Sequence, residues 1–356
     1  MRIVLLNLSN NITDYSTTPS AETIMIKRLF EEKFNVDCDI ISNNDGQYTK
    51  SFDSIKDINH YDKLLVINGA VNFFGGSENK TIINNYKLMS QYKSTIYYLL
   101  TDLRLPFKPL WPSIKNKDWA NKYNENDFNI QSKIVILSQG NDLNITKNIH
   151  KNIDNIDIKY CPIDQYRLHV DFNIQSSPTK LYDVIYGGSF RGGKREDKLV
   201  EFLFDIPYNV QTFGTMKLQQ FKNDKYKWTN HPTFIGKQPM NQVQQINSQA
   251  LCSIIIGDKN YNNNMITIRV WETMMSDCIC FIDKEFDKDQ NILQLDDFYI
   301  NNKQDFINKI NKIKNNNDYR LQLLHYQHQK LMDYVNNFNN FKNIIFNCLQ
   351  LDNNIL

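Results

Sequence analysis

The stretch that decides the fold is Asp183-Val184-Ile185-Tyr186-Gly187-Gly188-Ser189-Phe190-Arg191-Gly192-Gly193-Lys194-Arg195. An apolar run passes here into a glycine-rich turn and then into a helical segment. Glycines let the backbone approach an anion closely, and a helix N-terminus presents unpaired N–H groups and the positive end of its dipole. Arg191 and Arg195 add cations that suit a diphosphate. A tight turn with surface arginines is the alternative, so the prediction of a phosphate site needs support from other residues.

Buried strands alternate with helices on both sides of this stretch, which predicts parallel α/β sheets. We therefore expect an α/β protein with two Rossmann-like domains that face each other across a cleft. The first helix is expected to have Thr18 as N-cap and Pro19 at its first position. The expected strands are 3–8, 39–42, 63–68, 95–101, 133–138, 159–163, 181–186, 209–213, 250–257 and 278–283. The expected helices are 19–33, 80–92, 195–204, one from Pro239, 267–275, 303–313, 319–336 and 338–351. The expected domains are 1–165, a linker over 166–180, 181–336, and a C-terminal helix over 337–356.

Length and composition agree with this organisation. The chain has 356 residues, 41% hydrophobic and 22% charged, which suits two folded domains and argues against disorder. No apolar run approaches the about 20 residues that span a membrane. The net charge of +2 is too small to indicate nucleic-acid binding by itself. The six cysteines form no C-x-x-C pair, and the histidines show no metal-ligand spacing, so we expect reduced core cysteines and no protein-built metal site.

Two further segments in the second half suit a nucleotide sugar. Asp258-Lys259-Asn260-Tyr261 follows an apolar strand, and a helix then begins near Thr267. Arg269 and Glu272 share a face of that helix, so Arg269 can reach a phosphate and Glu272 can accept the hydroxyls of a ribose. A surface ion pair between them is the alternative. The loop Phe234–Met240, which includes Lys237 and Gln238, precedes another helix and can hold a base through its backbone.

Two carboxylates in the first half are candidates for acid–base chemistry. Asp102 follows the strand 95–101, and the transfer of a sugar to a hydroxyl with inversion needs one base to accept the hydroxyl proton. Glu22 lies in the first turn of the first helix, where it can also enter the site. The alternatives are ordinary: an aspartate that caps a turn, and an acid that is favourable at a helix N-terminus.

An aromatic loop and a basic segment in the first half suit DNA. Phe73 and Phe74 precede two glycines, and two adjacent aromatics cannot easily both be buried, so one can stack against an extruded base or fill its gap. Arg104, Lys108, Lys115 and Lys117 interleave with Trp111 and Trp119, which is typical of phosphate contacts. A partly exposed phenylalanine and a solvated basic loop are the alternatives.

Together these motifs resemble one family, the DNA β-glucosyltransferases of T-even bacteriophages. The resemblance covers nearly the whole chain. It is carried in order by Asn7, Asn10-Asn11, Thr17, Pro19-Ser20, Glu22-Thr23-Ile24, 48–53, 72–76, Thr101-Asp102, 104–106, 183–191, 201–205, 256–262 and 269–273.

The resemblance implies a GT-B fold whose C-terminal helix returns to the first domain. It implies UDP-glucose as donor and 5-hydroxymethylcytosine in double-stranded DNA as acceptor, with Asp102 as general base and Glu22 in support. A divalent cation, Mg²⁺ or Mn²⁺, is expected to stimulate turnover. A monomer in the cytoplasm of the infected bacterial host, which shields phage DNA from nucleases, is also implied. The implied donor-binding residues are Gly188, Ser189, Arg191, Arg195, Lys237, Gln238, Met240, Tyr261, Arg269 and Glu272, and the implied DNA-binding residues are Phe73, Phe74, Arg104, Lys115 and Lys117.

Three positions depart from the family pattern. Ser9 replaces a glycine near the sugar pocket, Lys117 replaces an arginine expected to enter the DNA, and Gln238 replaces an apolar residue. Lysine keeps the charge of arginine but loses its planar guanidinium. Another UDP-sugar or 5-hydroxymethyluracil therefore stays an alternative. A nucleotide-sugar transferase with a non-DNA acceptor is the alternative from a different class, and a catalytically dead DNA-binding relative is disfavoured by the retained site residues.

Overall fold

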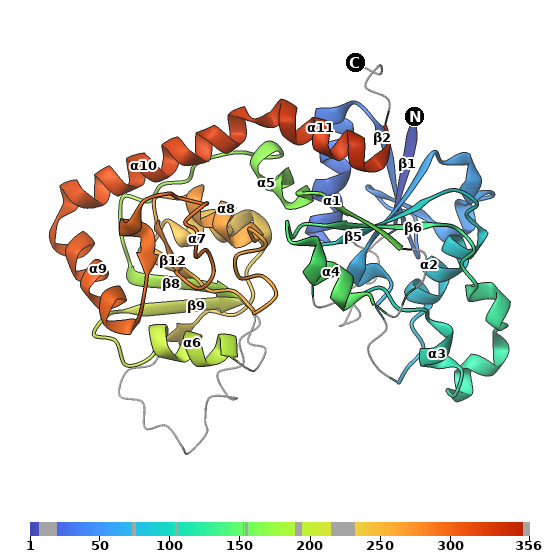
Figure 1. The fold of residues 1–356 in the computed structure, drawn as a ribbon, viewed down its shortest axis with the longest axis horizontal. Coiled ribbons are helices and arrows are strands. Elements are labelled where there is room, and N and C mark those ends of the chain that lie inside the picture. Colours follow the sequence, from blue (N-terminus) through green and yellow to red (C-terminus); the bar gives the residue numbers. More distant parts are fainter. Residues whose placement is uncertain are drawn as a thin grey trace. The chain divides into compact units, whose positions relative to one another are not determined.

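The structure is a computed structural model that describes residues 1–6, 20–72, 76–103, 106–151, 153, 156–188, 194–214 and 232–351. The chain forms two compact units, Met1–Val170 together with Asn339–Leu356, and Asp171–Phe338. Each unit is an α/β structure built on a parallel sheet (Figure 1). No helix among the described residues is long and apolar enough to span a membrane.

The first unit carries, within the described residues, a seven-stranded parallel sheet in the order β3-β2-β1-β4-β5-β6-β7. Its central strands are fully buried, as the continuous apolar runs predict. The strand order reverses between β1 and β4, and the carboxyl edge at such a reversal is where α/β proteins bind ligands. The strands are β1 (Arg2–Leu6), β2 (Asp37–Ser42), β3 (Thr49–Ser51), β4 (Lys63–Ile67), β5 (Ile96–Leu100), β6 (Ile134–Ser138) and β7 (Ile156–Tyr160).

Helices cover both faces of this sheet. The connection β1–α1–β2 runs in the opposite direction from β4–α2–β5 and β6–α4–β7, so right-handed crossovers place α1 on one face and α2 and α4 on the other. The helix α11 packs on the α1 side, where Phe34 contacts Phe341 and Phe346. The helices are α1 (Ala21–Arg28, continued by a π-helical turn over Leu29–Lys33), α2 (Lys80–Gln91), α3 (Trp111–Ile114), α4 (Leu143–Ile149), α5 (Tyr166–His169) and α11 (Phe338–Leu349).

The second unit repeats the plan with, in its described part, a six-stranded sheet in the order β10-β9-β8-β11-β12-β13. Its strand order reverses between β8 and β11. The strands are β8 (Tyr182–Gly188), β9 (Val210–Gly214), β10 (Thr233–Phe234), β11 (Ala250–Ile255), β12 (Ile279–Asp283) and β13 (Tyr299–Ile300). The helices are α6 (Lys194–Leu203), α7 (Val243–Asn247), α8 (Ile268–Met274), α9 (Lys303–Asn315) and α10 (Asn317–Asn336).

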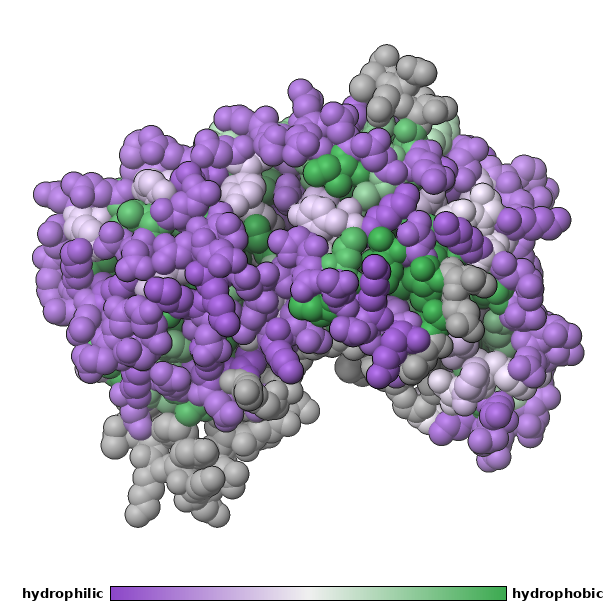
Figure 2. All heavy atoms as spheres, in the orientation of Figure 1, coloured by the Kyte–Doolittle hydropathy of each residue, from purple (hydrophilic) through white to green (hydrophobic). Residues whose placement is uncertain are grey.

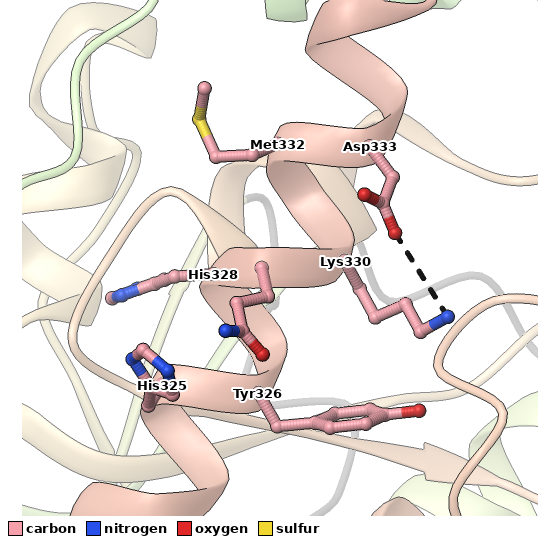
Figure 3. Close-up of a pocket in the computed structure, with 7 residues that line it drawn as sticks. His325, Tyr326, His328, Lys330, Met332 and Asp333 are labelled. Atoms are coloured by element: carbon pink, nitrogen blue, oxygen red, sulfur yellow. Dashed lines mark ion pairs between the residues drawn. The ribbon is translucent and has the colours of Figure 1, made fainter.

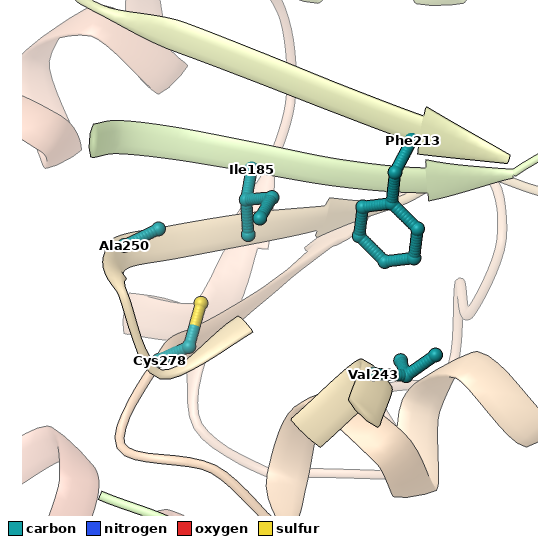
Figure 4. Close-up of a cluster of buried hydrophobic side chains, with 5 residues drawn as sticks. All are labelled: Ile185, Phe213, Val243, Ala250 and Cys278. Carbon is teal, nitrogen blue, oxygen red and sulfur yellow. The ribbon is translucent and has the colours of Figure 1, made fainter. Parts of the chain in front are cut away.

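The core of the second unit includes a cluster at the centre of this sheet. Ile185, Ala250 and Phe213 come from three strands and meet Val243 and Cys278 (Figure 4). Gly187 belongs to the same packing, because a Cβ at that position would lie 2.4 Å from the ring of Phe213. All six cysteines of the chain are buried and unpaired. Hydrophilic side chains cover most of the surface of the second unit on the side drawn in Figure 2.

Several sequence expectations are wrong in detail. The first helix begins at Ala21 with Ser20 as N-cap, whose hydroxyl accepts from the Thr23 N–H, whereas the start was expected at Pro19. Thr18 and Pro19 lie outside the described residues. The helix expected at Pro239 begins with a 3-10 turn over Met240–Gln242. The strand expected at 159–163 lies at Ile156–Tyr160, and the short strands β3, β10 and β13 were not expected because each is two or three residues long.

The expected linker over 166–180 is also wrong, because this stretch is folded into both units. Arg167 and His169 are buried in α5. Beyond Asp171 the chain joins the second unit, where Gln175 bridges to Ser276 and Lys180 forms an ion pair with Asp277. Tertiary contacts therefore override a polar composition that is typical of a linker.

Candidate active site

Four polar side chains meet at the carboxyl edge of the first sheet. Asn68 follows β4, Thr101 and Asp102 follow β5, and Glu22 lies in the first turn of α1. The Thr101 hydroxyl lies 3.0 Å from Asn68 Oδ1, and the Asn68 amide donates to the backbone carbonyl of Asp102 over 2.9 Å. These contacts fix the start of the loop that carries Asp102.

Glu22 has a pKa that differs strongly from its ordinary value. Burial raises its pKa to about 7, a hydrogen bond with the Thr101 side chain lowers it in part, and the negative charge of Asp102 raises it further. The effect of Asp102 on Glu22 shows that the two carboxyl groups are neighbours. A carboxyl that titrates near neutrality beside a second carboxylate is an arrangement suited to acid–base chemistry.

The second unit gathers cations at the carboxyl edge of its own sheet. Arg195 of α6 donates through Nη2 to the Tyr186 hydroxyl over 2.7 Å, and Arg269 of α8 donates through Nη1 to the same hydroxyl over 3.3 Å. The guanidinium of Arg269 also lies 5.1 Å from the centre of the Tyr186 ring. Asp258 lies 3.9 Å from Arg195 and limits its movement. Two arginines held on one tyrosine at the β8–β11 reversal are an arrangement suited to a doubly charged anion.

Two glycines, Gly188 and Gly214, close in on this site from the neighbouring strands β8 and β9. A Cβ at Gly188 would lie 2.9 Å from Arg269 Nη2 and from the Tyr186 ring, so a larger residue would displace the arginine. Gly214 pairs with Gly188 in register, has a φ of +119°, and would bring a Cβ within 2.0 Å of the Gly188 carbonyl. The Gly214 N–H in turn donates to the Gly236 carbonyl over 3.0 Å. The backbone here is as close to its neighbours as glycine permits.

The remaining donor-site candidates of the second unit lie on the same helix or in nearby loops. Glu272 is buried on α8, one turn after Arg269, and Tyr261 is buried in the turn after β11. In the loop before α7, Lys237 is exposed, Gln238 donates to the Ile235 carbonyl and Met240 is half-buried. The Gln238 contact closes the loop on itself and occupies the Ile235 carbonyl.

The basic segment of the first unit is tied to the flanks of the aromatic loop. Trp119 donates from its indole to the Gly76 carbonyl over 2.8 Å, and Lys122 and Tyr123 both bond to Glu78. Lys115 is exposed and Lys117 is half-buried on this segment. The structure therefore brings together two stretches that the sequence predicts to contact DNA.

Some predicted site residues lie outside the described part of the chain. They are Ser9, Phe73, Phe74, Arg104, Ser189 and Arg191. Other contributors to the site were not among the sequence candidates. Asn68 and Thr101 position the carboxylates, Tyr186 gathers the arginines and Gly214 allows the close approach of β9 to the Gly188 carbonyl. A position near a strand end was the available signal for each. The partners of Asn68 and Thr101 are more than 30 residues away, and Arg269 is 83 residues from Tyr186, so the sequence could not pair them.

No metal cage is formed by the described residues, because they contain no group of three histidine, cysteine or carboxylate side chains placed to bind one ion. The histidines spaced three apart on α10, His325 and His328, line a hollow of about 620 Å³ with Tyr326, Lys330 and Asp333 (Figure 3). His328 bonds to the Ser276 carbonyl and Lys330 pairs with Asp333. This hollow contains none of the predicted site residues, and His325 is exposed on the surface of α10.

The chain is similar to proteins of known activity. Residues 1–167 match the family model described as bacteriophage T4 beta-glucosyltransferase. The DNA beta-glucosyltransferase of Enterobacteria phage T4 is 49% identical over 333 residues, which cover 93% of this chain and 94% of that protein.

Solved structures of the T4 phage protein have the same fold. A mutant of T4 phage BGT in complex with UDP-glucose has a TM-score of 0.93 at 46% identity, and covers 99% of this chain and 100% of its own. T4 phage BGT with UDP and Mn²⁺ has a TM-score of 0.92 with the same identity and coverage. Alr3699/HepE of Anabaena, in complex with UDP-glucose, has a TM-score of 0.52 at 12% identity over 98% of both chains, which shows the fold alone. The predicted fold class, two Rossmann-like α/β domains of the GT-B type, is confirmed.

Proposed function

The chain belongs to the bacteriophage T4 beta-glucosyltransferase family, which makes it an enzyme that transfers glucose to DNA, and we propose that its acceptor is 5-hydroxymethylcytosine in double-stranded DNA. In this proposal UDP-glucose is the donor, the configuration at the sugar is inverted and Asp102 is the general base. The observation that carries the proposal is the similarity along 93% of the chain to a DNA beta-glucosyltransferase. The geometry of the two sheet edges supplies the residues for each step.

The donor diphosphate is held in the second unit. Arg195 and Arg269 each keep guanidinium N–H groups directed to the Tyr186 hydroxyl, so both are oriented before the ligand binds. Gly188 and Gly214 let an anion approach the backbone at the ends of β8 and β9. Glu272 accepts the ribose hydroxyls, and the loop with Lys237, Gln238 and Met240, together with Tyr261, holds the uridine. Ser189 and Arg191 stay predictions from the sequence.

The transfer step uses Asp102. The oxygen of the hydroxymethyl group attacks the anomeric carbon of glucose, its proton passes to the Asp102 carboxylate, and the bond from the anomeric carbon to UDP breaks. The electron pair of that bond leaves with UDP, whose charge the arginines stabilise. Asn68 holds the backbone of Asp102, and the raised pKa of Glu22 keeps this second carboxyl largely protonated below pH 7, which limits charge repulsion beside Asp102.

DNA is bound by the first unit. Lys115 and Lys117 lie on the segment that Trp119 fastens to Gly76, so cations and the flank of the aromatic loop form one surface. Their phosphate contacts make binding sensitive to salt. Phe73, Phe74 and Arg104 complete this surface in the proposal, with an aromatic ring near the extruded base.

A divalent cation fits this site as an ion carried with the nucleotide. Mg²⁺ or Mn²⁺ supplies extra positive charge to the diphosphate when bound, and the described residues offer no protein-built cage for it. The chain's own cations for the leaving group are Arg195 and Arg269.

We also propose that the enzyme acts as a monomer in the cytoplasm of an infected bacterium, where the modification protects phage DNA from nucleases.

Sugar transfer to defined DNA duplexes tests the proposal. Duplexes with 5-hydroxymethylcytosine, 5-hydroxymethyluracil or unmodified cytosine are incubated with UDP-glucose, and the digested nucleosides are weighed by mass spectrometry. We expect a hexose on hydroxymethylcytosine alone. A hexose on hydroxymethyluracil alone, or no transfer to any duplex while UDP-glucose still binds, would overturn the proposed acceptor. No binding of UDP-glucose would overturn the proposed donor.

A further inference from the structure

Gln139 is a buried amide whose hydrogen-bonding groups are unused. It follows β6 directly and is 5% exposed. Within the part of the chain that the structure describes, neither its Oε1 nor its Nε2 has a hydrogen-bond partner. A buried polar group without a partner costs roughly 1–3 kcal/mol, so such groups are rare in folded proteins and need an explanation.

The sheet places Gln139 in the row of residues that carries the catalytic carboxylates. Leu100 of β5 pairs with Ser138 of β6, so Thr101 and Gln139 directly follow the paired ends of these neighbouring strands. Thr101 contacts both Asn68 and Glu22. Gln139 therefore lies one strand away from the Glu22–Asp102 pair, at the same carboxyl edge.

The strand β6 ends at Ser138, directly before Gln139. The Ser138 hydroxyl bonds to Thr146 of α4, so Ser138 faces the helices α2 and α4. Gln139 lies in the bend directly after β6, where the Gly140 N–H donates to the Ser138 hydroxyl over 3.2 Å, so the chain turns at this carboxyl edge. The Trp119–Gly76 contact, next to the predicted DNA-binding residues, lies shortly before the start of α2.

We propose that Gln139 binds hydroxyl groups of the transferred glucose and is a specificity-determining residue for the sugar. A carboxamide offers an acceptor and a donor side by side, and a sugar hydroxyl both donates and accepts, so one or two hydroxyls satisfy both ends of the side chain. The amide is neutral, so it adds this recognition without a third charge beside Glu22 and Asp102. This inference rests on the proposed transfer of glucose and assigns a residue that selects the sugar.

Removing the amide while keeping the shape tests the proposal. We compare the wild type with Gln139→Met, which is unbranched and of similar length. Calorimetry measures the affinity for UDP-glucose and for UDP alone, and initial rates are measured with UDP-glucose and with its 2-, 3-, 4- and 6-deoxy analogues. Gln131→Met, at a residue outside the row of catalytic carboxylates, is the matched control.

The expected result is a loss of roughly 10-fold in the affinity for UDP-glucose with unchanged affinity for UDP, since a buried hydrogen bond is lost only when the sugar is present. The wild type should discriminate against at least one deoxy analogue, and Gln139→Met should lose that discrimination. Equal discrimination in both proteins, or a change confined to the KM for DNA, would overturn the assignment to the sugar. Equal loss of UDP and UDP-glucose binding would also overturn it, because that pattern indicates a structural role.

Failure of this inference and failure of the proposed acceptor are distinguishable. The calorimetric comparison of UDP-glucose with UDP needs no DNA, so it reports on Gln139 even if the wild type transfers glucose to no hydroxymethylated duplex.

Discussion

Asn68 donates its side-chain amide to the backbone carbonyl of Asp102 over 2.9 Å, across 34 residues of sequence. The same side chain accepts from the Thr101 hydroxyl and from the Gly69 N–H. Asn68 thus joins the ends of β4 and β5 and holds the loop of the proposed base. Its own backbone carbonyl accepts from Asn72, which extends the network toward the aromatic loop.

Replacement of Asn68 should therefore impair the chemical step. We expect Asn68→Ala to lower kcat by roughly 10–100-fold with a small change in KM, because a displaced general base loses its alignment. Steady-state kinetics with saturating UDP-glucose measures this. Asn59→Ala is the matched control, since Asn59 also donates to a backbone carbonyl, that of Gln91, at a surface remote from the carboxyl edge. Equal losses of kcat in both variants would contradict the positioning role.

The Tyr186 hydroxyl should matter for binding the donor diphosphate. Tyr186→Phe keeps the ring under Arg269 but removes the acceptor shared by both arginines. We expect the affinity for UDP to fall by about 5–20-fold, in line with the loss of hydrogen bonds to charged groups. Tyr208→Phe is the control, because the Tyr208 hydroxyl donates to the Ile307 carbonyl away from the arginines. Tighter UDP binding by Tyr186→Phe would show that the hydroxyl competes with phosphate instead of orienting the arginines.

Two glycines with positive φ should respond very differently to alanine. At Gly214 the new Cβ would lie 2.0 Å from the Gly188 carbonyl, whereas at Gly236 it would meet no atom within 4 Å. We expect Gly236→Ala to lower the free energy of unfolding by roughly 1–2 kcal/mol, the conformational cost alone. Gly214→Ala should cost at least about 3 kcal/mol and also weaken UDP binding. Denaturant unfolding checks both, and similar losses would contradict the close approach of β8 and β9 at this point.

The altered pKa of Glu22 should appear in the pH dependence of stability. Its folded-state pKa of about 7 exceeds the ordinary value of 4.5, so the folded protein binds more protons than the unfolded one between these two values. Stability from this group is fully present below pH 4.5 and is lost as the pH rises to 7. Glu22→Gln should therefore gain stability over the wild type across this range and keep the gain above pH 7. A difference between the two proteins that does not vary with pH would contradict the raised pKa.

His169 should change the pH dependence of stability in the opposite direction to Glu22. Burial, helped by the charge of Lys33, lowers its pKa to about 4, and its ring lies 4.7 Å from that of Phe341 on α11. Its contribution to stability is present above pH 6.5 and is lost as the pH falls toward 4, by at most about 1.4 kcal/mol per pH unit. His169→Phe should flatten this loss in thermal unfolding curves, and a variant as acid-sensitive as the wild type would argue against the assignment.

Local sequence determined the classes of structure and the candidate residues. Continuous apolar runs predict buried parallel strands, and their alternation with helices predicts two α/β units, because both patterns depend on neighbours within one element. The glycine-rich turn at 183–195 and the position of Asp102 after a strand could be recognised in the same way. The folded structure of the stretch 166–180 could not be recognised from local sequence, since Arg167 and His169 are buried by contacts that their polar sequence does not indicate.

The tertiary structure alone decided which of these residues meet. Strand order places Asn68 and Thr101 together. It also brings Arg195 and Arg269, which are 74 residues apart in the sequence, to one tyrosine. It also gives Glu22 a pKa near 7, because that value follows from burial and from the charge of Asp102. The sequence specifies each residue locally, whereas burial and proximity arise only when the strands are ordered in the sheet.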